Sequence, residues 1–257
     1  MIKMFDQGMP VKFYSAGGSA QEIKDAGGDS LLWAGLLQLS GEDHVNAILA
    51  CQSNDGRFWR SPRLKENDPI NSFSRDMAIG LISAAMVSLP VASALQRWVD
   101  FTVKNKYMAA NDATDNRELM TPQIYWLASH VPGVRVPWYF RATRRLLPVY
   151  LLFACMSAPR GFQLHLVACM VFILQMRYGG GYRITAKVLN RRHNNNLFFM
   201  WLAGQQDSTQ ISLMKSKADS GTQGLGSQWC WERSDAMEAV KDSMGHDLQF
   251  ILNLYSR

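Results

Sequence analysis

The sequence is poor in several features that mark specialised proteins. Its four cysteines, Cys51, Cys155, Cys169 and Cys230, are far apart and form no C-x-x-C pair, which argues against a disulfide framework and a metal site. We therefore expect free buried thiols, a chain that folds in the cytoplasm, and no metal. Neither G-x-S-x-G nor H-E-x-x-H occurs, and Gly179–Gly181 lacks the strand–helix setting of a phosphate loop. No cofactor is expected.

Long apolar runs are also lacking. The strongest, Leu146–Met156 and Leu164–Met176, are shorter than the roughly 20 residues needed to cross a bilayer, and Pro159–Gly161 lies between them. The N-terminus has no apolar core of signal-peptide type. We interpret both runs as buried helices and expect no membrane span.

Charged residues make up only 19% of the chain, and the net charge is +6. The densest basic cluster is Arg141–Leu147, and no Lys/Arg-rich run of the nucleic-acid type occurs, so no nucleic-acid partner is expected. Tryptophan, in contrast, is frequent, with eight residues. Because a buried indole N–H needs a hydrogen-bond partner, several tryptophans in one domain often line half-open surfaces.

Helical signals recur along the chain. Asp29–Gly41 combines an Asp/Ser start, an apolar run and a terminal glycine, and the helix expected next follows so closely that the two should form a hairpin. Ser74 is the expected N-cap of a helix ending near Leu89, and Pro90 opens another. The buried face predicted for that helix is Ala92, Leu95, Trp98, Val99 and Thr102. Further helices are expected within 121–131, 137–156, 161–178, 184–204 and 243–255.

The predicted fold class is mainly α, because few segments alternate with period two and none pairs through a hairpin turn. Residues 1–28 are interpreted as an extended N-terminal segment and residues 29–257 as a single domain. The rhythm of helix, short loop and helix favours antiparallel helical hairpins packed side by side, either as an open solenoid or as a complete or incomplete toroid.

Two segments place aromatic residues beside charged ones, which suits neither a linker nor a core. The first contains Arg57, Phe58, Trp59, Arg60, Phe73, Arg75 and Asp76, and the second contains Trp229, Trp231, Glu232, Arg233, Asp235, His246 and Asp247. We interpret both as the rim of a cavity with exposed aromatics. In a toroid, the N-terminal ends of the inner helices, including Asp29, would converge on that cavity. Aromatic faces beside charged groups are a common way to hold sugar rings.

Simpler explanations stay open for several of these residues. Carboxylates at helix N-termini are favoured by capping and by the helix dipole. This alone would account for Asp29, Asp76, Asp242, Asp247, Glu232 and Asp235. Arg75 and Asp76 could form only a structural ion pair. His165, within an apolar run, fits a hydrogen-bonded core histidine.

Three stretches carry a family resemblance: "DGRFWRSP…NSFSRDMAIG", "GFQLHLVACMVFIL" and "QWCWERSDAMEAVKDSMGHDLQFILNL". They resemble the helical-hairpin toroids, or (α/α)n barrels, of glycoside hydrolases and polysaccharide lyases. "SFSRDMAIG" and "WERSD…SMGHD" are also similar to uncharacterised proteins of tailed bacteriophages and their hosts. The resemblance spans residues 29–255 and implies a carbohydrate-directed site with a poly- or oligosaccharide partner.

Two chemistries and one rival class follow from this resemblance. Glycoside hydrolysis needs two carboxyl groups, roughly 6.5–9.5 Å apart for inversion or about 5–5.5 Å for retention; Asp76 and Glu232 are the expected pair, with Asp235 and Asp247 in reserve. A lyase would instead use His246 or His165 for proton transfer. The expected substrate-binding residues are Asp29, Arg57, Trp59, Arg60, Arg75, Trp229, Trp231, Arg233 and His246. The rival is a non-enzymatic structural or receptor-binding component of a phage tail or fibre, whose partners are other virion proteins.

Overall fold

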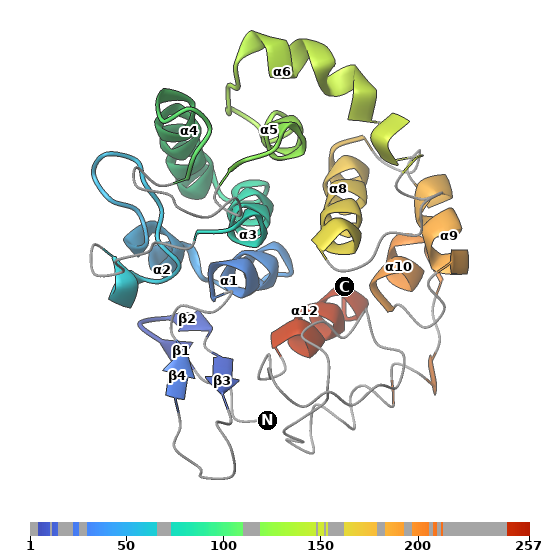
Figure 1. The fold of residues 1–257 in the computed structure, drawn as a ribbon. Helices are drawn as coiled ribbons and strands as arrows, with labels where there is room; N and C mark the ends of the chain where they lie inside the picture. Colours follow the sequence, from blue (N-terminus) through green and yellow to red (C-terminus); the bar gives the residue numbers. More distant parts are fainter. Residues whose placement is uncertain are drawn as a thin grey trace. The chain divides into compact units, whose positions relative to one another are not determined.

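The computed structural model describes residues 5–10, 12–14, 23–25, 30–65, 73–109, 119–147, 149–151, 153, 162–178, 183–192, 197–205, 208–209, 212 and 246–257. The chain divides into two compact units, which are described separately. Unit 1 comprises Met1–Phe5, Pro10–Asp25 and Leu152–Arg257, and unit 2 comprises Asp6–Met9 and Ala26–Leu151. The described part is mainly helical (Figure 1), which confirms the predicted class. The single domain predicted over residues 29–257 stays a prediction.

Unit 2 is built from helical hairpins. Its helical elements are α1 (Ser30–Leu39), α2 (Val45–Ala50), η1 (Pro62–Leu64), α3 (Arg75–Ala85), α4 (Leu89–Lys104), α5 (Pro122–Ala128), α6 (Trp138–Thr143) and η3 (Arg144–Leu146). Within each of the pairs α1/α2, α3/α4 and α5/α6, the two helices contact each other. In addition, α3 contacts both α1 and α5, so the odd-numbered helices form a row and the even-numbered helices lie outside it (Figure 1).

The tightest packing in unit 2 is between α1 and α3, where two glycines let the backbones touch. A Cβ added at Gly35 would lie 1.9 Å from the carbonyl oxygen of Gly80, and one added at Gly80 would lie 2.4 Å from Cα of Leu32. Real Cβ atoms do not approach backbone this closely. The large apolar side chains of α1, from Leu31 to Leu39, are at most 1% exposed, so this helix is buried except at Gln38, which is partly exposed.

The start and the buried face of α4 agree with the sequence prediction. Pro90 lies in the first turn of α4, and Ser74 occupies the N-cap position of α3. Proline suits the first turn because its φ is already helical, whereas Ser74 makes no side-chain capping hydrogen bond. All five residues of the predicted buried face are at most 6% exposed: Ala92, Leu95, Trp98, Val99 and Thr102.

An aromatic cluster joins α5 and α6. The rings of Tyr125 and Phe140 are stacked, with centroids 4.3 Å apart and planes at 4°. Tyr107, which follows α4, meets both rings edge-on at 5.8 and 5.7 Å. Its hydroxyl is hydrogen-bonded to that of Tyr139. These ring contacts hold α6 against α5 by one face.

One apolar run was assigned to the wrong environment. The prediction that Leu146–Met156 is buried is wrong for Leu146, Val149 and Phe153, which are 52%, 48% and 63% exposed. Leu147 and Leu151, in contrast, are each 2% exposed. Because an apolar run contains apolar residues on all sides of a helix, it does not reveal that only one side is covered.

The N-terminal segment contains short strands that the sequence did not predict. β1 (Phe5–Asp6) and β2 (Met9–Pro10) are joined by Gln7 and Gly8, whose φ values of 50° and 79° are those of a tight turn. In unit 2 this turn lies against α2, because the His44 Nδ1 atom and the Gly8 carbonyl oxygen are 3.1 Å apart and hydrogen-bonded.

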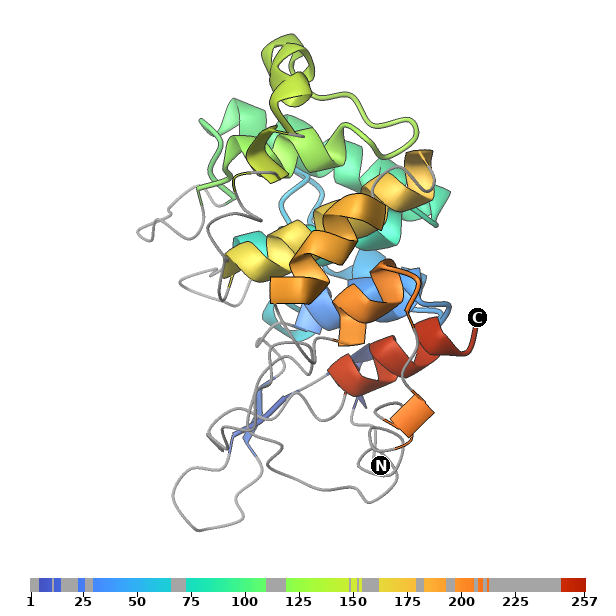
Figure 2. The ribbon, with the colours of Figure 1, turned by 90° about the vertical axis from the view of Figure 1, so that its right-hand side faces the viewer.

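Unit 1 contains β3 (Lys12–Tyr14) and β4 (Ile23–Asp25), which pair antiparallel with Phe13 opposite Lys24. Its helices are α8 (Phe162–Tyr178), α9 (Arg183–Arg192), α10 (Leu197–Leu202) and α12 (His246–Tyr255). α10 contacts the other three (Figure 2). The Phe198 ring lies between Phe172 of α8 and Phe250 of α12, with centroids 5.8 and 5.3 Å away. These rings form the described core of unit 1.

Candidate functional site

The first of the two predicted rim segments is a closed loop in unit 2. We call residues 51–61 the 51–61 loop. Its two ends are joined by a hydrogen bond from the Trp59 N–H to the Cys51 carbonyl at 3.0 Å, and its tip by one from the Ser53 N–H to the Arg57 carbonyl at 2.9 Å. The loop therefore has a defined backbone rather than the open form of a linker.

Gln52 attaches this loop to α4. Its side chain is 7% exposed, and its Nε2 donates to the carbonyls of Gly56 and Ala94 at 3.0 and 2.9 Å. Its Oε1 accepts from Nε and Nη2 of Arg97 at 3.0 and 2.5 Å. Both N–H donors and both acceptor positions of this buried amide are thus used. These four bonds fix the position of the loop on α4.

Gly56 makes the same attachment possible at the backbone level. Its φ of 98° lies in the left-handed region, and an added Cβ would be 2.7 Å from the carbonyl oxygen of Arg97. A residue with a side chain would be strained in conformation and would also clash with α4. This close approach has no signal in the sequence.

Buried aromatic rings connect the loop to the start of α3. The ring of Phe58 lies 6.3 Å from that of Phe73, which in turn lies 5.6 Å from Trp98 of α4. Because Phe73 precedes Arg75 by two residues, these contacts bring the loop to the first turn of α3. The expectation that Phe58 and Phe73 are exposed is wrong, since both are 0% exposed.

Trp59 is covered rather than open. It is 5% exposed, its Nε1 donates to Ser53 Oγ at 2.7 Å, and the guanidinium carbon of Arg57 lies 4.2 Å from its ring centroid. This is a cation–π contact. The expectation of an exposed indole is therefore wrong, and a sugar could stack on this ring only after Arg57 moves. The substrate-binding role of Trp59 stays a prediction.

Asp76 and Arg75 form the first turn of α3, and both side chains are half-buried. The Oδ1 atom of Asp76 is buried from solvent. A carboxylate in this position is favoured by the positive end of the helix dipole. Arg60, at the end of the 51–61 loop, is also half-buried. The structure thus places a carboxylate and guanidinium groups on two segments that the Phe58–Phe73 contact holds together.

Most of the second rim segment falls outside the described residues, namely Trp229, Trp231, Glu232, Arg233 and Asp235. Asp29 falls outside them too. Asp247 is the second residue of α12, and its side chain is not described. His246 is 1% exposed, and its ring lies 5.5 Å from that of Phe5 in unit 1. The pairing of Asp76 with Glu232 and the convergence on one mouth stay predictions.

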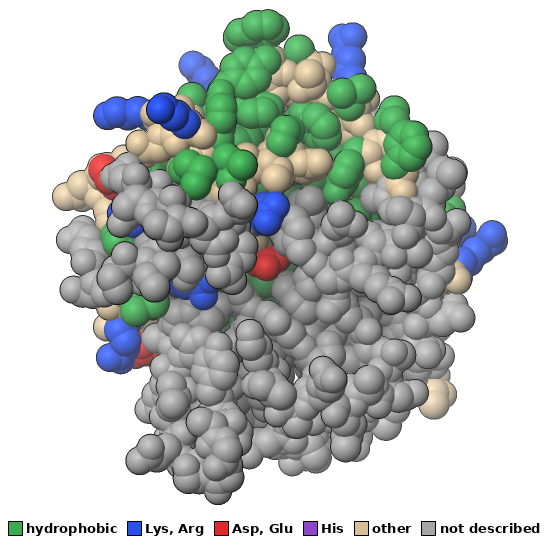
Figure 3. All heavy atoms as spheres, viewed as in Figure 1, with side chains coloured by type: hydrophobic (Ala, Val, Ile, Leu, Met, Phe, Trp, Pro, Cys, Tyr) green, Lys and Arg blue, Asp and Glu red, His purple; other side chains and the backbone are tan. Residues whose placement is uncertain are grey.

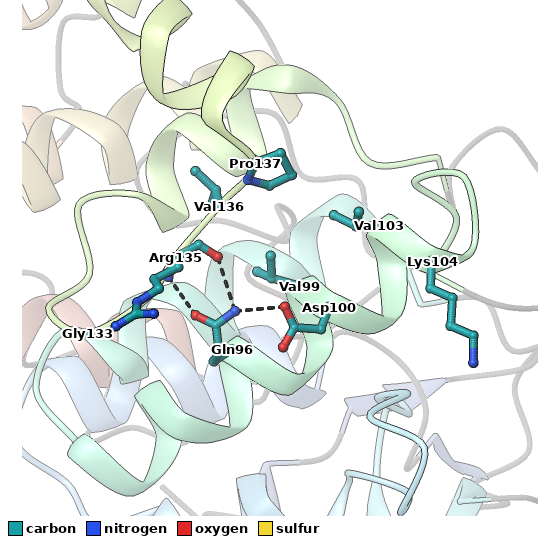
Figure 4. Close-up of a pocket in the computed structure, with 9 residues that line it drawn as sticks. All are labelled: Gln96, Val99, Asp100, Val103, Lys104, Gly133, Arg135, Val136 and Pro137. Carbon is teal, nitrogen blue, oxygen red and sulfur yellow. Dashed lines mark hydrogen bonds between the residues drawn. The ribbon is translucent and has the colours of Figure 1, made fainter.

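A surface groove of about 790 Å³ in unit 2 was missed by the sequence analysis (Figure 4). Gln96 crosses it: its Oε1 accepts from the Arg135 N–H at 2.6 Å, and its Nε2 donates to the Arg135 carbonyl at 3.1 Å and to Asp100 Oδ1 at 2.9 Å. The side chains of Val99 and Val136 form an apolar wall beside these groups. The i, i+4 spacing of Gln96 and Asp100 was the available signal.

Unit 1 has a smaller pocket of about 290 Å³, lined by Gln175, Arg183, Trp201, Leu202, Gly204 and Gln205. Its polar groups serve the fold. Gln175 Nε2 donates to the Leu202 carbonyl at 2.9 Å, and Trp201 Nε1 donates to the Leu254 carbonyl at the same distance. Both bonds join helices of unit 1, so these two side chains serve the fold.

Cysteine chemistry finds no support at this site. Cys51 and Cys169 are buried thiols outside any disulfide, as predicted, whereas Cys155 and Cys230 lie outside the described residues. Burial raises the pKa of the Cys51 thiol well above its ordinary value, and the nearby Lys65 lowers it only in part. A thiol in that state is a poor nucleophile.

Comparisons with protein-family models, with curated proteins and with solved structures find no match to this chain. Among the residues that the structure describes, no group of three His, Cys, Asp or Glu side chains is placed to hold a metal ion. No described helix is both long and apolar enough to cross a bilayer. The function must therefore be argued from the site itself.

Proposed function

We propose that this chain is a carbohydrate-directed protein of the (α/α)-toroid type. The fold part of this proposal is supported by the row formed by α1, α3 and α5 in unit 2, each with its partner helix on the outside. Side-by-side helical hairpins of this kind are the repeating element of such toroids. The row supports a ring, complete or incomplete, of which unit 2 supplies the first three hairpins.

The proposed sugar site lies at the first turn of α3 beside the 51–61 loop. Asp76, Arg75 and Arg60 supply charged groups there, and all three are half-buried. Groups held in this way can donate to and accept from sugar hydroxyls through charge-assisted hydrogen bonds. The hydrogen bonds of Gln52 fix the loop, so the site is largely formed before a ligand arrives.

In the catalytic form of the proposal, Asp76 is one of two carboxyl groups and Glu232 is the other. One protonates the glycosidic oxygen, while the other acts as base or nucleophile at the anomeric carbon. Asp235 and Asp247 are the alternative second groups. If the substrate is a polyuronate, the arginines would neutralise the sugar carboxylate during elimination, with His246 or His165 as proton carrier.

The experiment combines a glycan-array screen with polysaccharide turnover by the wild type, Asp76→Asn and Glu232→Gln. Each substitution removes a charge and keeps the shape, so a catalytic loss of about a hundredfold or more is expected without loss of sugar binding. Asp43→Asn is the matched control, because Asp43 is an exposed acid of unit 2 outside the 51–61 loop and α3. Turnover equal in all four proteins would exclude Asp76 and Glu232 as catalytic groups.

Two other results would decide between the classes. In the first, a defined glycan binds the wild type but not Asp76→Asn, and no form cleaves it. The site would then be one of recognition alone, as in a receptor-binding virion component. No glycan bound and no polysaccharide cleaved would reject the carbohydrate proposal as a whole.

A further inference from the structure

Residues 138–147 and 149–151 of unit 2, which we call the α6 segment, have two faces of different character. Phe140, Leu147 and Leu151 point inward and are 9%, 2% and 2% exposed, whereas Trp138 is 76% exposed and Val149 48%. Ala142 and Arg145, also in this segment, are exposed as well. The outward side therefore presents apolar side chains to solvent, with Arg145 among them.

The inward contacts fix which face points outward. Phe140 stacks on Tyr125 with centroids 4.3 Å apart. Trp126 Nε1 donates to Thr143 Oγ1 at 3.0 Å, and the Trp126 ring lies 6.5 Å from that of Tyr150. These contacts extend along the segment. Rotating it to bury Trp138 would break all of them, so the exposure of Trp138 belongs to the folded state.

The same segment is strongly basic. Arg141, Arg144 and Arg145 are all exposed, and the sequence between Glu118 and Asp207 contains ten Lys and Arg residues and no Asp or Glu. Figure 3 shows hydrophobic side chains gathered in the upper part of the molecule, where Figure 1 places α6, with Lys or Arg side chains at both edges. A partner of this surface must supply negative charge and also accept apolar groups.

We propose that the α6 segment binds the surface of an anionic lipid bilayer. Trp138, Leu146 and Val149 would enter the boundary between headgroups and acyl chains, as tryptophan and aliphatic residues of interfacial helices do. Arg141, Arg144 and Arg145 would pair with lipid phosphates. This binding is peripheral and involves no spanning helix, and it does not depend on the proposed carbohydrate site.

Two other partners fit the surface less well. A second copy would meet it through the same patch, because symmetric dimers use one surface on both subunits; Arg141, Arg144 and Arg145 would then face each other with no acid of the segment between them. Nucleic acid would accept the arginines, but its phosphate backbone offers nothing to Leu146 and Val149. A lipid surface satisfies both kinds of side chain.

The test is flotation of the full chain with vesicles of equal parts phosphatidylcholine and phosphatidylglycerol, beside vesicles of phosphatidylcholine alone. Wild type should bind the anionic vesicles, and added salt should weaken the binding. Replacing Arg141, Arg144 and Arg145 together by Gln should weaken it about a hundredfold, at about fivefold for each arginine. Trp138→Ala should weaken it about tenfold.

Two controls match these variants. Leu89→Ala removes an apolar side chain that is 77% exposed on α4, and Lys104→Gln removes an exposed charge from the same helix; both should bind vesicles as the wild type does. Circular dichroism of every variant checks the fold, and since the altered side chains point outward, no change is expected. A variant that unfolds is replaced by Val149→Ser, for which about threefold weaker binding is expected.

Three results would overturn the proposal. One is failure of the wild type to float with anionic vesicles. Another is binding that the arginine variant and Trp138→Ala leave unchanged. The third is absence of vesicle binding together with either a dimer in light scattering or retention of a DNA duplex, each of which disappears in Trp138→Ala. That result would assign the surface to a second copy or to nucleic acid.

Discussion

Helix α1 and the α6 segment are both apolar parts of unit 2, yet they are stabilised in different ways. α1 is buried except at Gln38, and its backbone touches that of α3 at Gly35 and Gly80. The α6 segment is held by one face, through Phe140 and its neighbours, and presents Trp138 to solvent. Apolar composition alone does not separate the two; the glycine in one and the arginines in the other do.

This difference determines where a small change has a large effect. At α1, the limiting quantity is space, because no atom can be added between two touching backbones. At the α6 segment, the limiting quantity is the contact area of a few inward rings, since the outward side chains contribute little to folding. The predictions below test this contrast, beginning with the largest expected effect.

The largest effect is expected for Gly35→Ala. Alanine favours helix by about 1 kcal/mol over glycine, so helix propensity alone predicts a more stable protein. The added Cβ would instead lie 1.9 Å from the Gly80 carbonyl oxygen, and the overpacking should reverse the sign and lower the free energy of unfolding by about 3 kcal/mol or more. Chemical denaturation followed by circular dichroism measures it.

Gly133→Ala is the control for this substitution. Gly133 has a φ of 82°, and an added Cβ would meet nothing within 4 Å, so only backbone strain of about 1 kcal/mol is expected. If Gly35→Ala were as stable as the wild type, α1 and α3 would not be in backbone contact.

The second prediction compares the two faces of α6. Phe140→Ala removes the ring that stacks on Tyr125 at 4.3 Å and should lower the free energy of unfolding by about 3 kcal/mol. Trp138→Ala changes a larger side chain but should alter it by less than about 0.5 kcal/mol, because Trp138 is 76% exposed. Thermal unfolding of both variants tests this order; the reverse order would mean that Trp138 is covered in solution.

The smallest effect concerns pH. Burial raises the pKa of Tyr139 to about 12, helped by its hydrogen bond with Tyr107, while the unfolded chain keeps the ordinary value of about 10. The stabilisation of the folded state by the protonated Tyr139 hydroxyl is therefore complete below pH 10. It is lost as the pH rises from about 10 to about 12. Tyr139→Phe should lose less stability than the wild type between pH 9 and pH 11 in urea denaturation. An identical loss in both proteins would exclude this hydroxyl as the cause.

Helix positions were largely readable from the sequence because their signals are local. Ser74, Pro90 and the apolar spacing of α4 each act within a few residues, and the structure confirms them. The predicted helix at residues 161–178 corresponds to α8, Phe162–Tyr178. β1 to β4 were missed because strands of two or three residues are too short to show a period-two pattern.

The environment of the site residues was not readable, because it depends on contacts distant in sequence. Phe58 and Phe73 lie beside charged residues in the chain, yet their rings contact each other and are buried. Trp59 has Arg57 on its face, and no spacing rule distinguishes a covered indole from an open one. The roles of Asp76 and Glu232 rest on resemblance, and only experiment can test them.

The contact between Gly35 and Gly80 has a consequence for Asp76. The separation of α1 and α3 is set there by main-chain atoms, so replacing side chains elsewhere in unit 2 cannot bring the two helices closer together. Asp76 precedes Gly80 by four residues, about 6 Å along the helix axis. The backbone of Asp76 therefore lies close to a contact whose position does not depend on side chains. Variants of this chain could change the side chains around Asp76 and still keep its carboxylate at the same distance along α3 from the contact with α1.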